Sequence, residues 1–363
     1  MASTPTARDQ PASPSPPGLG RRAHRNTAGA LARRFAGQTP HVVIAGGFCL
    51  LGRRLARYLL EGGWDVTIVD SPLPRSQMEG VPRLGPGALS VVWHDLAVPL
   101  HIDDHVHAVI NLAALRAGID EGDAGVVRAA ERATEPTLEL ASRHNAVFVL
   151  ASSSDVYGGC RQGGLHEDEL GGSYRDATLG PRQKAYRVAE AQTTAAAHTH
   201  DMRARIARLF NVYGSLTDPG SDVVTTLLAQ ALRGSPLTVH GDGSQTRTFV
   251  YVDDAADALV RLLRPDLTLP GAVNIGGAEP TSIIALARMI RRLTGSASTV
   301  RRCPEPVGTI RHRHPDIGRA SRYLAWRPRT PLAEGLAQAI HHTPAPEVVR
   351  APAPVAARLS HQV

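Results

Sequence analysis

Short apolar runs alternate with helical patterns along the first half of the chain. The run HVVIA at His41–Ala45 predicts a buried strand, and the segment LLGRRLARYLLE that follows repeats its apolar positions with the period of a helix. Gly62 and Gly63 mark the end of that helix, because glycine readily ends helices. Trp64–Asp70 alternates apolar with polar positions and is rich in β-branched residues, which predicts a second strand.

The alternation of strands and helices continues as far as residue 209. Further strands are predicted at Leu89–Trp93, Ala108–Leu112, Ala146–Ala151 and Arg205–Leu209. Helical patterns fall between most of them, for example at Val126–His144 and Arg182–Thr199. Strands that alternate with helices form βαβ units, whose strands lie parallel. The sequence therefore predicts an α/β fold with a Rossmann-type, doubly wound parallel sheet.

The pattern changes after about residue 213, where a second part of the fold is expected. Two helices are predicted at Val223–Arg233 and Thr281–Thr294, with a turn and a short strand in GDGSQTRTFVYVDD between them. We therefore expect a Rossmann domain over residues 39–213. Residues 214–342 are predicted to form a smaller, interleaved substrate-binding lobe that also carries the last Rossmann elements.

Two terminal segments, residues 1–38 and 343–363, lack hydrophobic periodicity and are expected to be disordered tails. The first is rich in Pro, Ser, Ala and Arg. The charge is concentrated there: the net charge of the chain is +7, and six arginines with one aspartate place +5 of it in residues 1–40. The folded body is close to neutral, so specific binding to nucleic acid is not expected.

Hydropathy and cysteine content indicate a protein of the cytoplasm. No apolar run approaches the roughly 18 residues that a membrane span needs, and the N-terminus lacks the apolar region of a secretory signal. The three cysteines, Cys49, Cys160 and Cys303, are odd in number and widely spaced, which predicts thiols in a reducing compartment. We predict neither a membrane partner nor a metal site.

A glycine-rich turn between the first strand and the first helix predicts a dinucleotide site. In this context backbone N–H groups at the helix N-terminus face a pyrophosphate. The residues predicted to line it are Gly46, Phe48, Cys49, Leu50, Leu51 and Gly52. The alternative is that the glycines only make a tight turn.

Two acidic residues strengthen the dinucleotide interpretation. Asp70 ends the second predicted strand, 18 residues after Gly52. A carboxylate there accepts hydrogen bonds from the adenosine ribose and repels a 2′-phosphate, which favours NAD over NADP. Asp95 follows the third strand, where it could bind the adenine amino group. Each residue has a plainer alternative, as a turn or helix-capping aspartate.

Several segments, in order, resemble the extended short-chain dehydrogenase/reductases, also called the NAD-dependent epimerase/dehydratase family. The similar segments cover roughly residues 41–340. They are AVINLAAL at Ala108–Leu115, FVLASSSDVYGG at Phe148–Gly159, RIARLFNVYG at Arg205–Gly214, HGDGSQTRTFVYVDDAADAL at His240–Leu259, NIGGAEPTSI at Asn274–Ile283, HPDIGRA at His314–Ala320 and WRPRTPLAEGL at Trp326–Leu336. Within the family, ASSSDVYGG and HPDI look most like UDP-glucuronate decarboxylases, with Asp155 in the position of their glutamate.

The resemblance implies an activity and partners. Family members oxidise a sugar hydroxyl with NAD, after which epimerisation, dehydration or decarboxylation becomes possible and the hydride returns. The substrate implied is a UDP- or dTDP-sugar. Leu112, Ala113 and Ala114 match the strand end that passes under the nicotinamide ribose. The helices at Val126–His144 and Arg182–Thr199 match those through which the family forms homodimers.

The resemblance also implies roles for single residues. Ser153 matches the hydroxyl that orients the sugar oxygen, and Asp155 matches an acid/base position. Arg247 matches an arginine that contacts substrate phosphate or an acidic sugar, and forked recognition of that kind suits a guanidinium. Asn211 and Arg313 match substrate-binding positions. A turn, cap or surface role is the alternative for each.

The chain departs from the family pattern in three places: Pro306 stands where many epimerases carry an arginine, and the other two departures lie among the predicted site residues. Cys49 replaces the middle glycine of the turn, which we expect to weaken cofactor binding without abolishing it. The Tyr-x-x-x-Lys pair is also missing. In one register Arg182 takes the Tyr position and Tyr186 the Lys position, whereas in the other Lys184 is kept but Gly180 replaces the Tyr.

The altered pair leaves two hypotheses open. Arg182 and Tyr186 are four residues apart on one helical face, so the arginine could lower the pKa of the tyrosine hydroxyl. The chain would then be an active enzyme. Alternatively, Tyr186 only packs, and the chain is a catalytically impaired homologue that binds NAD or a sugar nucleotide as a sensor, scaffold or partner subunit.

Overall fold

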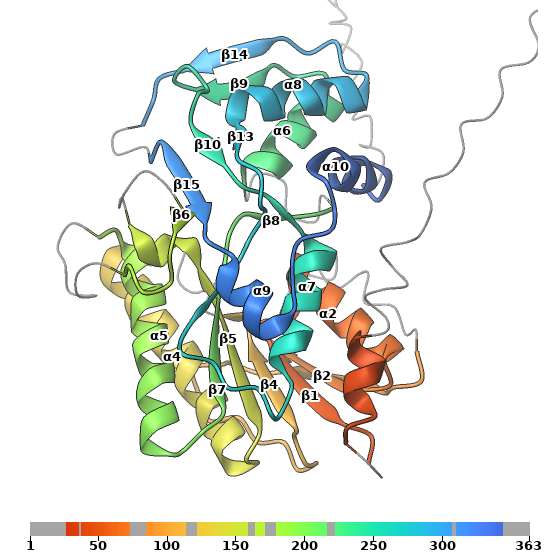
Figure 1. Ribbon diagram of the computed structural model, residues 1–363, viewed down its shortest axis with the longest axis vertical. Helices are drawn as coiled ribbons and strands as arrows, with labels where there is room; N and C mark the ends of the chain where they lie inside the picture. Colours follow the sequence, from red (N-terminus) through yellow and green to blue (C-terminus); the bar gives the residue numbers. More distant parts are fainter. Residues whose placement is uncertain are drawn as a thin grey trace, which may run out of the picture.

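A seven-stranded, wholly parallel sheet forms the centre of the computed structural model, which describes residues 27–35, 38–72, 85–113, 122–158, 164–170, 179–215, 222–306 and 310–343 (Figure 1). The strand order is β12-β7-β5-β4-β1-β2-β3. The strands are β1 (His41–Ala45), β2 (Asp65–Asp70), β3 (Leu89–Trp93), β4 (Ala108–Asn111), β5 (Val147–Ser153), β7 (Ala204–Leu209) and β12 (Val273–Ile275). This order confirms the predicted doubly wound α/β fold. The direction of winding reverses between β1 and β4, and the carboxyl ends there are where such folds bind ligands.

Helices cover both faces of this sheet, which explains why the inner strands β1 and β4 are buried along their whole length. Helices α2 (Leu50–Glu61) and α7 (Val252–Leu262) pack together on one face, and α4 (Gly122–Arg143) and α5 (Pro181–Thr199) pack on the other (Figure 1). Alternate residues of β1 belong to the two resulting cores. Val42 and Ile44 lie in the same cluster as helix α2, whereas Val43 and Ala45 lie in the cluster of helix α4.

A smaller lobe lies beyond the carboxyl ends of the strands (Figure 1). Its four-stranded sheet has the order β13-β10-β15-β6. These strands are β13 (Thr281–Ser282), β10 (Thr246–Arg247), β15 (His312–Pro315) and β6 (Gly164–Leu165). The remaining elements here are β8 (Val212–Tyr213), β9 (Leu237–His240), β11 (Val250–Tyr251), β14 (Val300–Cys303), α6 (Val223–Leu232), α8 (Ile283–Thr294) and α10 (Leu332–His341).

Each of the two sheets contains one strand from the other half of the sequence. β6 comes from the first half of the sequence but joins the small sheet, and β12 comes from the second half but completes the large one. Helix α9 (Gly318–Leu324) packs against β12.

The N-terminal segment differs from its expected disorder. Residues 27–32 are helical, Ala28 and Leu31 are buried, and the Trp64 indole Nε1 donates a hydrogen bond of 3.2 Å to the Ala28 carbonyl. The apolar spacing extends over only two helical turns, with prolines and arginines around it, and so short a pattern did not predict a helix. Residues 1–26 and 344–363, the rest of the predicted tails, lie outside the described residues.

A buried ion pair holds the large sheet to helix α5. The Arg208 guanidinium on β7 contacts the Glu190 carboxylate through two hydrogen bonds of 2.9 and 2.8 Å, and the Ser152 hydroxyl donates to the same carboxylate at 2.6 Å. Both charged side chains are more than nine-tenths buried. Burial disfavours the guanidinium charge, but the Glu190 carboxylate outweighs burial and raises the pKa of Arg208.

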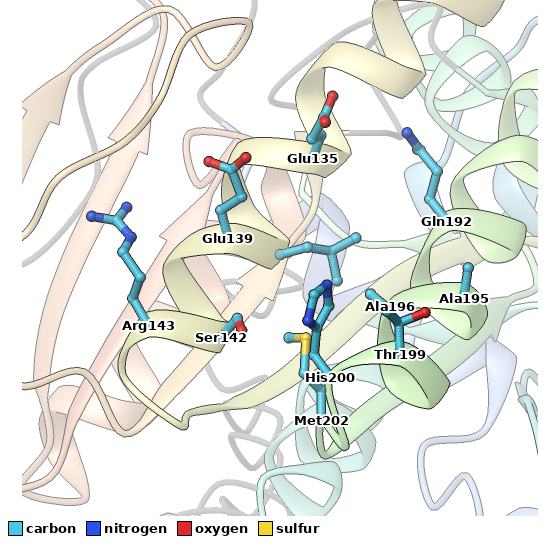
Figure 2. A pocket seen from close by; sticks show the side chains of 11 residues that line it. Glu135, Glu139, Ser142, Arg143, Gln192, Ala195, Ala196, Thr199, His200 and Met202 are labelled. Carbon is cyan, nitrogen blue, oxygen red and sulfur yellow. The ribbon is translucent and has the colours of Figure 1, made fainter.

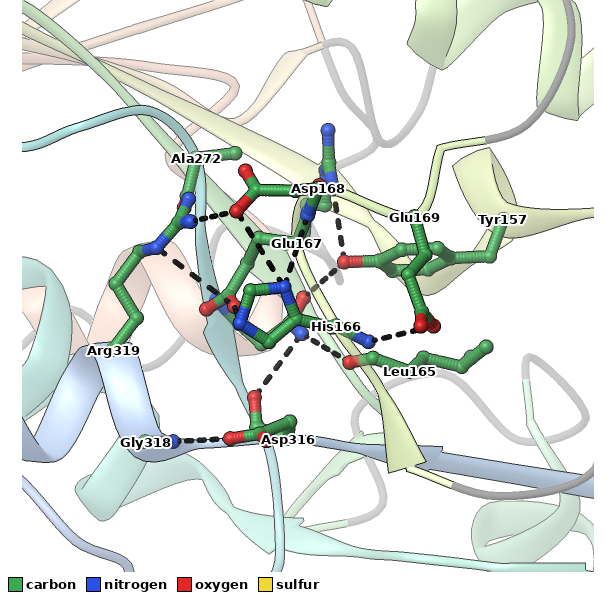
Figure 3. A network of polar contacts seen from close by, with 12 residues as sticks. Tyr157, Leu165, His166, Glu167, Asp168, Glu169, Ala272, Asp316, Gly318 and Arg319 are labelled. Atoms are coloured by element: carbon green, nitrogen blue, oxygen red, sulfur yellow. Dashed lines mark hydrogen bonds and ion pairs between the residues drawn. The ribbon is translucent and has the colours of Figure 1, made fainter.

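The same arginine connects the sheet to the smaller lobe. Arg208 Nη1 donates to the Tyr157 hydroxyl at 3.0 Å, and that hydroxyl donates to Asn274 Oδ1 at 2.6 Å. The Asn274 backbone N–H donates to Glu167 Oε1 at 2.9 Å. Arg319 of α9 then pairs with Asp168 at 2.7 Å (Figure 3). Because Glu167 and Asp168 are adjacent in the sequence, these contacts connect β7 to helix α9.

Replacing Glu190 tests how much the fold depends on this ion pair. In Glu190→Gln the Arg208 charge stays buried without its carboxylate, and breaking a buried pair costs about 3–5 kcal/mol. We expect the free energy of unfolding in urea to fall by that amount. Asp266→Asn is the matched control, because it breaks the exposed Arg34–Asp266 pair and should leave the unfolding midpoint nearly unchanged. Equal effects of the two substitutions would contradict the account.

Histidines gather at the opposite, amino-terminal edge of the sheet. His107 Nδ1 accepts from the His41 backbone N–H at 3.1 Å, and His144 Nδ1 accepts from the Val106 backbone N–H at 3.3 Å. The His105 ring lies 4.6 Å from that of His107. Burial lowers the pKa of His41, His107 and His144, and repulsion from His105 lowers each further. The fold therefore favours the neutral imidazoles.

This histidine cluster predicts a loss of stability in mild acid. The folded-state pKa values lie below the unfolded value of about 6.5, so the unfolded chain takes up more protons as the pH falls below that value. The free energy of unfolding should be constant near pH 8 and should decrease as the pH falls from about 6.5 towards 5. His107→Gln should weaken this dependence in urea titrations, whereas His198→Gln on the exposed end of α5 should not. An unchanged pH dependence in His107→Gln would exclude the cluster as its cause.

Candidate active site

The turn from β1 to α2 has the geometry of a dinucleotide-binding loop at two of its three glycine positions. Gly46 has φ +73°, and a Cβ on it would lie 2.8 Å from the Ala113 backbone nitrogen. A Cβ on Gly52 would lie 2.4 Å from the Gly47 carbonyl oxygen. The first glycine therefore permits the tight turn, and the last permits close packing of helix and strand.

Cys49, at the middle position, caps helix α2. Its φ and ψ of −80° and 168° are those of an extended residue, and its Sγ accepts a hydrogen bond of 3.4 Å from the Gly52 N–H. The sulfur thus occupies the N-terminus of α2, beside the first-turn N–H groups of Leu50 and Leu51. Those groups have no partner within the helix, which suits an anion such as a pyrophosphate.

The acidic residue predicted for the ribose faces this turn. Asp70 Oδ2 accepts from the Phe48 N–H at 3.0 Å, and Oδ1 accepts from the Ser71 N–H at 3.0 Å. The residues present at the carboxyl ends of β1 and β2 therefore fit NAD. Asp95 Oδ1 instead accepts from the Ala97 N–H at 2.9 Å, as the turn interpretation expects.

The strand end predicted to pass under the nicotinamide ribose is only partly described. Leu112 and Ala113 are buried after β4, where Leu112 N–H donates to the Ala45 carbonyl at 2.9 Å. Ala114 lies outside the described residues. The two described residues thus follow the β4 strand directly beside the end of β1.

Replacing Cys49 with glycine tests whether the sulfur hinders the cofactor. Cys49→Gly removes the Cβ and the sulfur from the helix N-terminus, while glycine at this cap costs only a few tenths of a kcal/mol in stability. We expect NAD to bind several-fold more tightly in isothermal titration calorimetry. Cys303→Ala on β14 is the control and should bind NAD as the unchanged chain does. Weaker binding in Cys49→Gly would show that the sulfur does not obstruct the site.

Residues at the end of β5 meet an arginine from the smaller lobe. The Ser153 hydroxyl accepts from the Asp155 N–H at 3.1 Å and so caps the short 3-10 helix η2 (Ser154–Tyr157). Asp155 Oδ1 lies 2.5 Å from Arg313 Nη1, and Arg313 Nη2 donates to the Gly158 carbonyl at 3.2 Å. Asp155 and Arg313 are 158 positions apart in the sequence.

The altered Tyr/Lys pair lies at the start of α5. Arg182 and Tyr186 interact electrostatically, as their spacing predicts. Burial raises the pKa of the Tyr186 hydroxyl, and Arg182 offsets only part of that increase. Arg182 therefore lowers the pKa of Tyr186, as predicted, but the effect of burial is larger and the net shift is an increase. Lys184 is about 200° around the helix from both residues, so α5 does not bring it beside them.

Two further predicted residues, Arg247 and Asn211, donate hydrogen bonds to backbone carbonyls. Arg247 Nη2 donates to the Ile310 carbonyl at 2.7 Å and Nη1 to the Thr246 carbonyl at 2.8 Å. Burial lowers the pKa of Arg247, and the nearby Arg313 lowers it further. Asn211 has φ +39°, and its Nδ2 donates to the Thr248 carbonyl at 2.8 Å, which matches the turn interpretation.

Two histidines beside these arginines were not predicted as site residues. The Thr246 hydroxyl lies 2.8 Å from His312 Nδ1 and 2.8 Å from His314 Nε2. Burial and the neighbouring His312 and Arg247 charges lower the pKa of His314. The available signal was the alternation RHRHP, because residues two apart on a strand share one face.

Asp155 is the common neighbour of the predicted catalytic and substrate-binding groups. Besides its contact with Arg313, its charge acts on Arg182, Tyr186 and Arg247. Arg313 is thus in contact with the Asp155 carboxylate, and Arg182 and Arg247, from other elements, are near enough to interact with its charge. Such an assembly has an excess of positive charge and suits an anionic ligand.

A groove of about 570 Å³ lies elsewhere, between helices α4 and α5 (Figure 2). Its lining includes Glu135, Leu138, Gln192 and Met202 and none of the predicted site residues. We place the site by the assembled charges and the glycine turn.

Comparison with known proteins gives the class that this fold and site define. The profile of the NAD-dependent epimerase/dehydratase family matches residues 42–276, and the chain belongs to that family. UDP-glucuronic acid decarboxylase 1 of Danio rerio is 33% identical over 308 residues, covering 83% of this chain and 72% of the relative. UDP-glucuronic acid decarboxylase 5 of Arabidopsis thaliana is 30% identical over 307 residues, covering 84% and 89%.

Solved structures of related proteins agree with this assignment. MoeE5 in complex with UDP-glucuronic acid and NAD has a TM-score of 0.69 at 28% identity, covering 83% of this chain and 98% of that one. UDP-glucuronic acid 4-epimerase from Bacillus cereus has a TM-score of 0.71 at 24% identity, with the same coverage, and shows the shared fold. Among the helices in the described residues, none is long and apolar enough to cross a membrane.

Proposed function

We propose that the chain is an NAD-dependent decarboxylase of a UDP-linked acidic sugar, with UDP-glucuronic acid as the substrate. The observation that carries the proposal is the contact of the Arg313 guanidinium with Asp155, to whose charge Arg182 and Arg247 also respond. This substrate is anionic at both its diphosphate and its sugar carboxylate, so it matches an excess of positive charge. The decarboxylase relatives at 30–33% identity favour this substrate over a neutral sugar.

The cofactor part of the proposal rests on the turn between β1 and α2. Asp70 would hold the adenosine ribose, and the first turn of α2 would face the pyrophosphate. Bound NAD would accept a hydride from the sugar and later return it.

Residues of the chain supply the proton transfers in this proposal. The Ser153 hydroxyl orients the sugar hydroxyl, and the Asp155 carboxylate accepts its proton as the ketone forms. The bond between ring carbon and carboxylate then breaks, carbon dioxide leaves, and the electron pair moves toward the ketone oxygen. Tyr186, whose raised pKa keeps it protonated, donates a proton to the ring carbon. Arg313 stabilises the negative charge.

A product assay in deuterated water tests the proposal. With UDP-glucuronic acid and NAD we expect a product that has lost carbon dioxide and gained one solvent deuterium. Arg313→Gln should lower kcat/KM by about 100-fold or more, because a buried donor to developing charge is lost. Arg311→Gln is the matched control, since that side chain is 50% exposed and pairs with Glu305. A product of unchanged mass would indicate epimerisation, and binding without turnover would exclude an active decarboxylase.

A second candidate function is that of a catalytically impaired homologue. It is favoured by the absence of the Tyr-x-x-x-Lys pair and by the raised pKa of Tyr186. Such a protein would bind NAD or the sugar nucleotide as a sensor, scaffold or partner subunit. In the assay above it would bind NAD or the sugar nucleotide without releasing product. Homodimerisation through α4 and α5 and a cytoplasmic location stay predictions.

A further inference from the structure

An aromatic pair stands beside the predicted ribose-binding carboxylate. The rings of Phe48 and Trp93 are stacked, with centroids 5.1 Å apart and planes 13° apart. Phe48 belongs to the glycine-rich turn, and Trp93 is the last residue of β3. The pair therefore lies at the carboxyl ends of β1 and β3, at the edge of the sheet where doubly wound folds bind nucleotides.

Register fixes Trp93 next to Asp70. The two residues are partners in the parallel ladder of β2 and β3. Partners in neighbouring strands lie about 4.8 Å apart, and their side chains leave the sheet on the same face. The Phe48 N–H also donates to Asp70 Oδ2 at 3.0 Å. One carboxylate and two aromatic rings therefore share one side of the sheet.

The two rings differ in how much of their surface is covered. Phe48 is 5% exposed, whereas Trp93 is 38% exposed. The other two tryptophans, Trp64 and Trp326, are 0% and 1% exposed. The Phe48 ring thus covers one face of the indole, while a large part of Trp93 remains exposed to solvent. An indole held in a fixed orientation with an open surface can stack on a planar base at little cost in conformational freedom.

We propose that Phe48 and Trp93 form a stacking platform for the adenine of the dinucleotide. The adenine would lie on the open surface of Trp93 while Asp70 holds the attached ribose. The inference rests on the NAD site of the proposed function, but it concerns the adenine end alone. It also compensates for Cys49, because stacking supplies binding energy at a site where the middle glycine is missing.

Adenine-containing ligands without a sugar substrate test the platform. Trp93→Ala should raise the Kd of ADP-ribose by about tenfold in isothermal titration calorimetry, which is the usual effect of removing one base-stacking ring. Trp93→Phe keeps an aromatic face and should stay within about threefold of the unchanged chain. Val91→Ala is the matched control, because Val91 lies two residues earlier on the same face of β3 and is 41% exposed. Thermal melts establish that each variant folds.

Tryptophan fluorescence gives a second readout. AMP and ADP-ribose should quench the emission of the unchanged chain, whereas nicotinamide mononucleotide, which lacks adenine, should not. The quenching should disappear in Trp93→Phe, since Trp64 and Trp326 are buried. Equal affinity of Trp93→Ala and the unchanged chain for ADP-ribose would overturn the platform, as would failure of ADP-ribose to bind either. Loss of decarboxylation with normal ADP-ribose binding would refute the proposed reaction alone.

Discussion

The buried pair of Arg208 and Glu190 is the interaction on which the rest of the structure depends. A guanidinium so far from water requires a carboxylate beside it, and this requirement fixes β7 against α5. The remaining donors of Arg208 reach the Tyr157 hydroxyl and the Glu167 carbonyl at 3.0 and 2.8 Å. One side chain thereby connects the large sheet, the end of β5 and the segment that leads to the smaller lobe.

The position of the candidate site follows from that connection. Tyr157 is the last residue of η2, and Asp155 lies in the same short helix. Because the Tyr157 hydroxyl is held by both Arg208 and Asn274, η2 has little freedom to move. Asp155 is therefore presented in a fixed place to Arg313 of the smaller lobe. The position of Asp155 therefore depends on a polar network whose members, Arg208, Glu190, Tyr157 and Asn274, are not among the predicted site residues.

The sequence predicts the local features of this protein well and its long-range contacts poorly. Strand β1 and strand β3 have the predicted bounds, and the contact of Arg182 with Tyr186 follows from a spacing of four residues. A two-residue strand such as β6 is too short to show a periodicity in the sequence, and its position depends on its pairing with β15. The pairing of Asp155 with Arg313 cannot be predicted from the sequence either, because it depends on how the two lobes pack together. Burial of Tyr186, which decides the sign of its pKa shift, is likewise a property of the folded chain.

The central claim is that these assembled charges and the glycine turn bind NAD and an acidic sugar nucleotide. The most direct test is to denature the purified protein and to identify by mass spectrometry the nucleotides it releases. The account predicts released NAD, and, after incubation with UDP-glucuronic acid, a UDP-sugar that has lost carbon dioxide. A protein that releases no nucleotide and also fails to bind added NAD or UDP-glucuronic acid would contradict it.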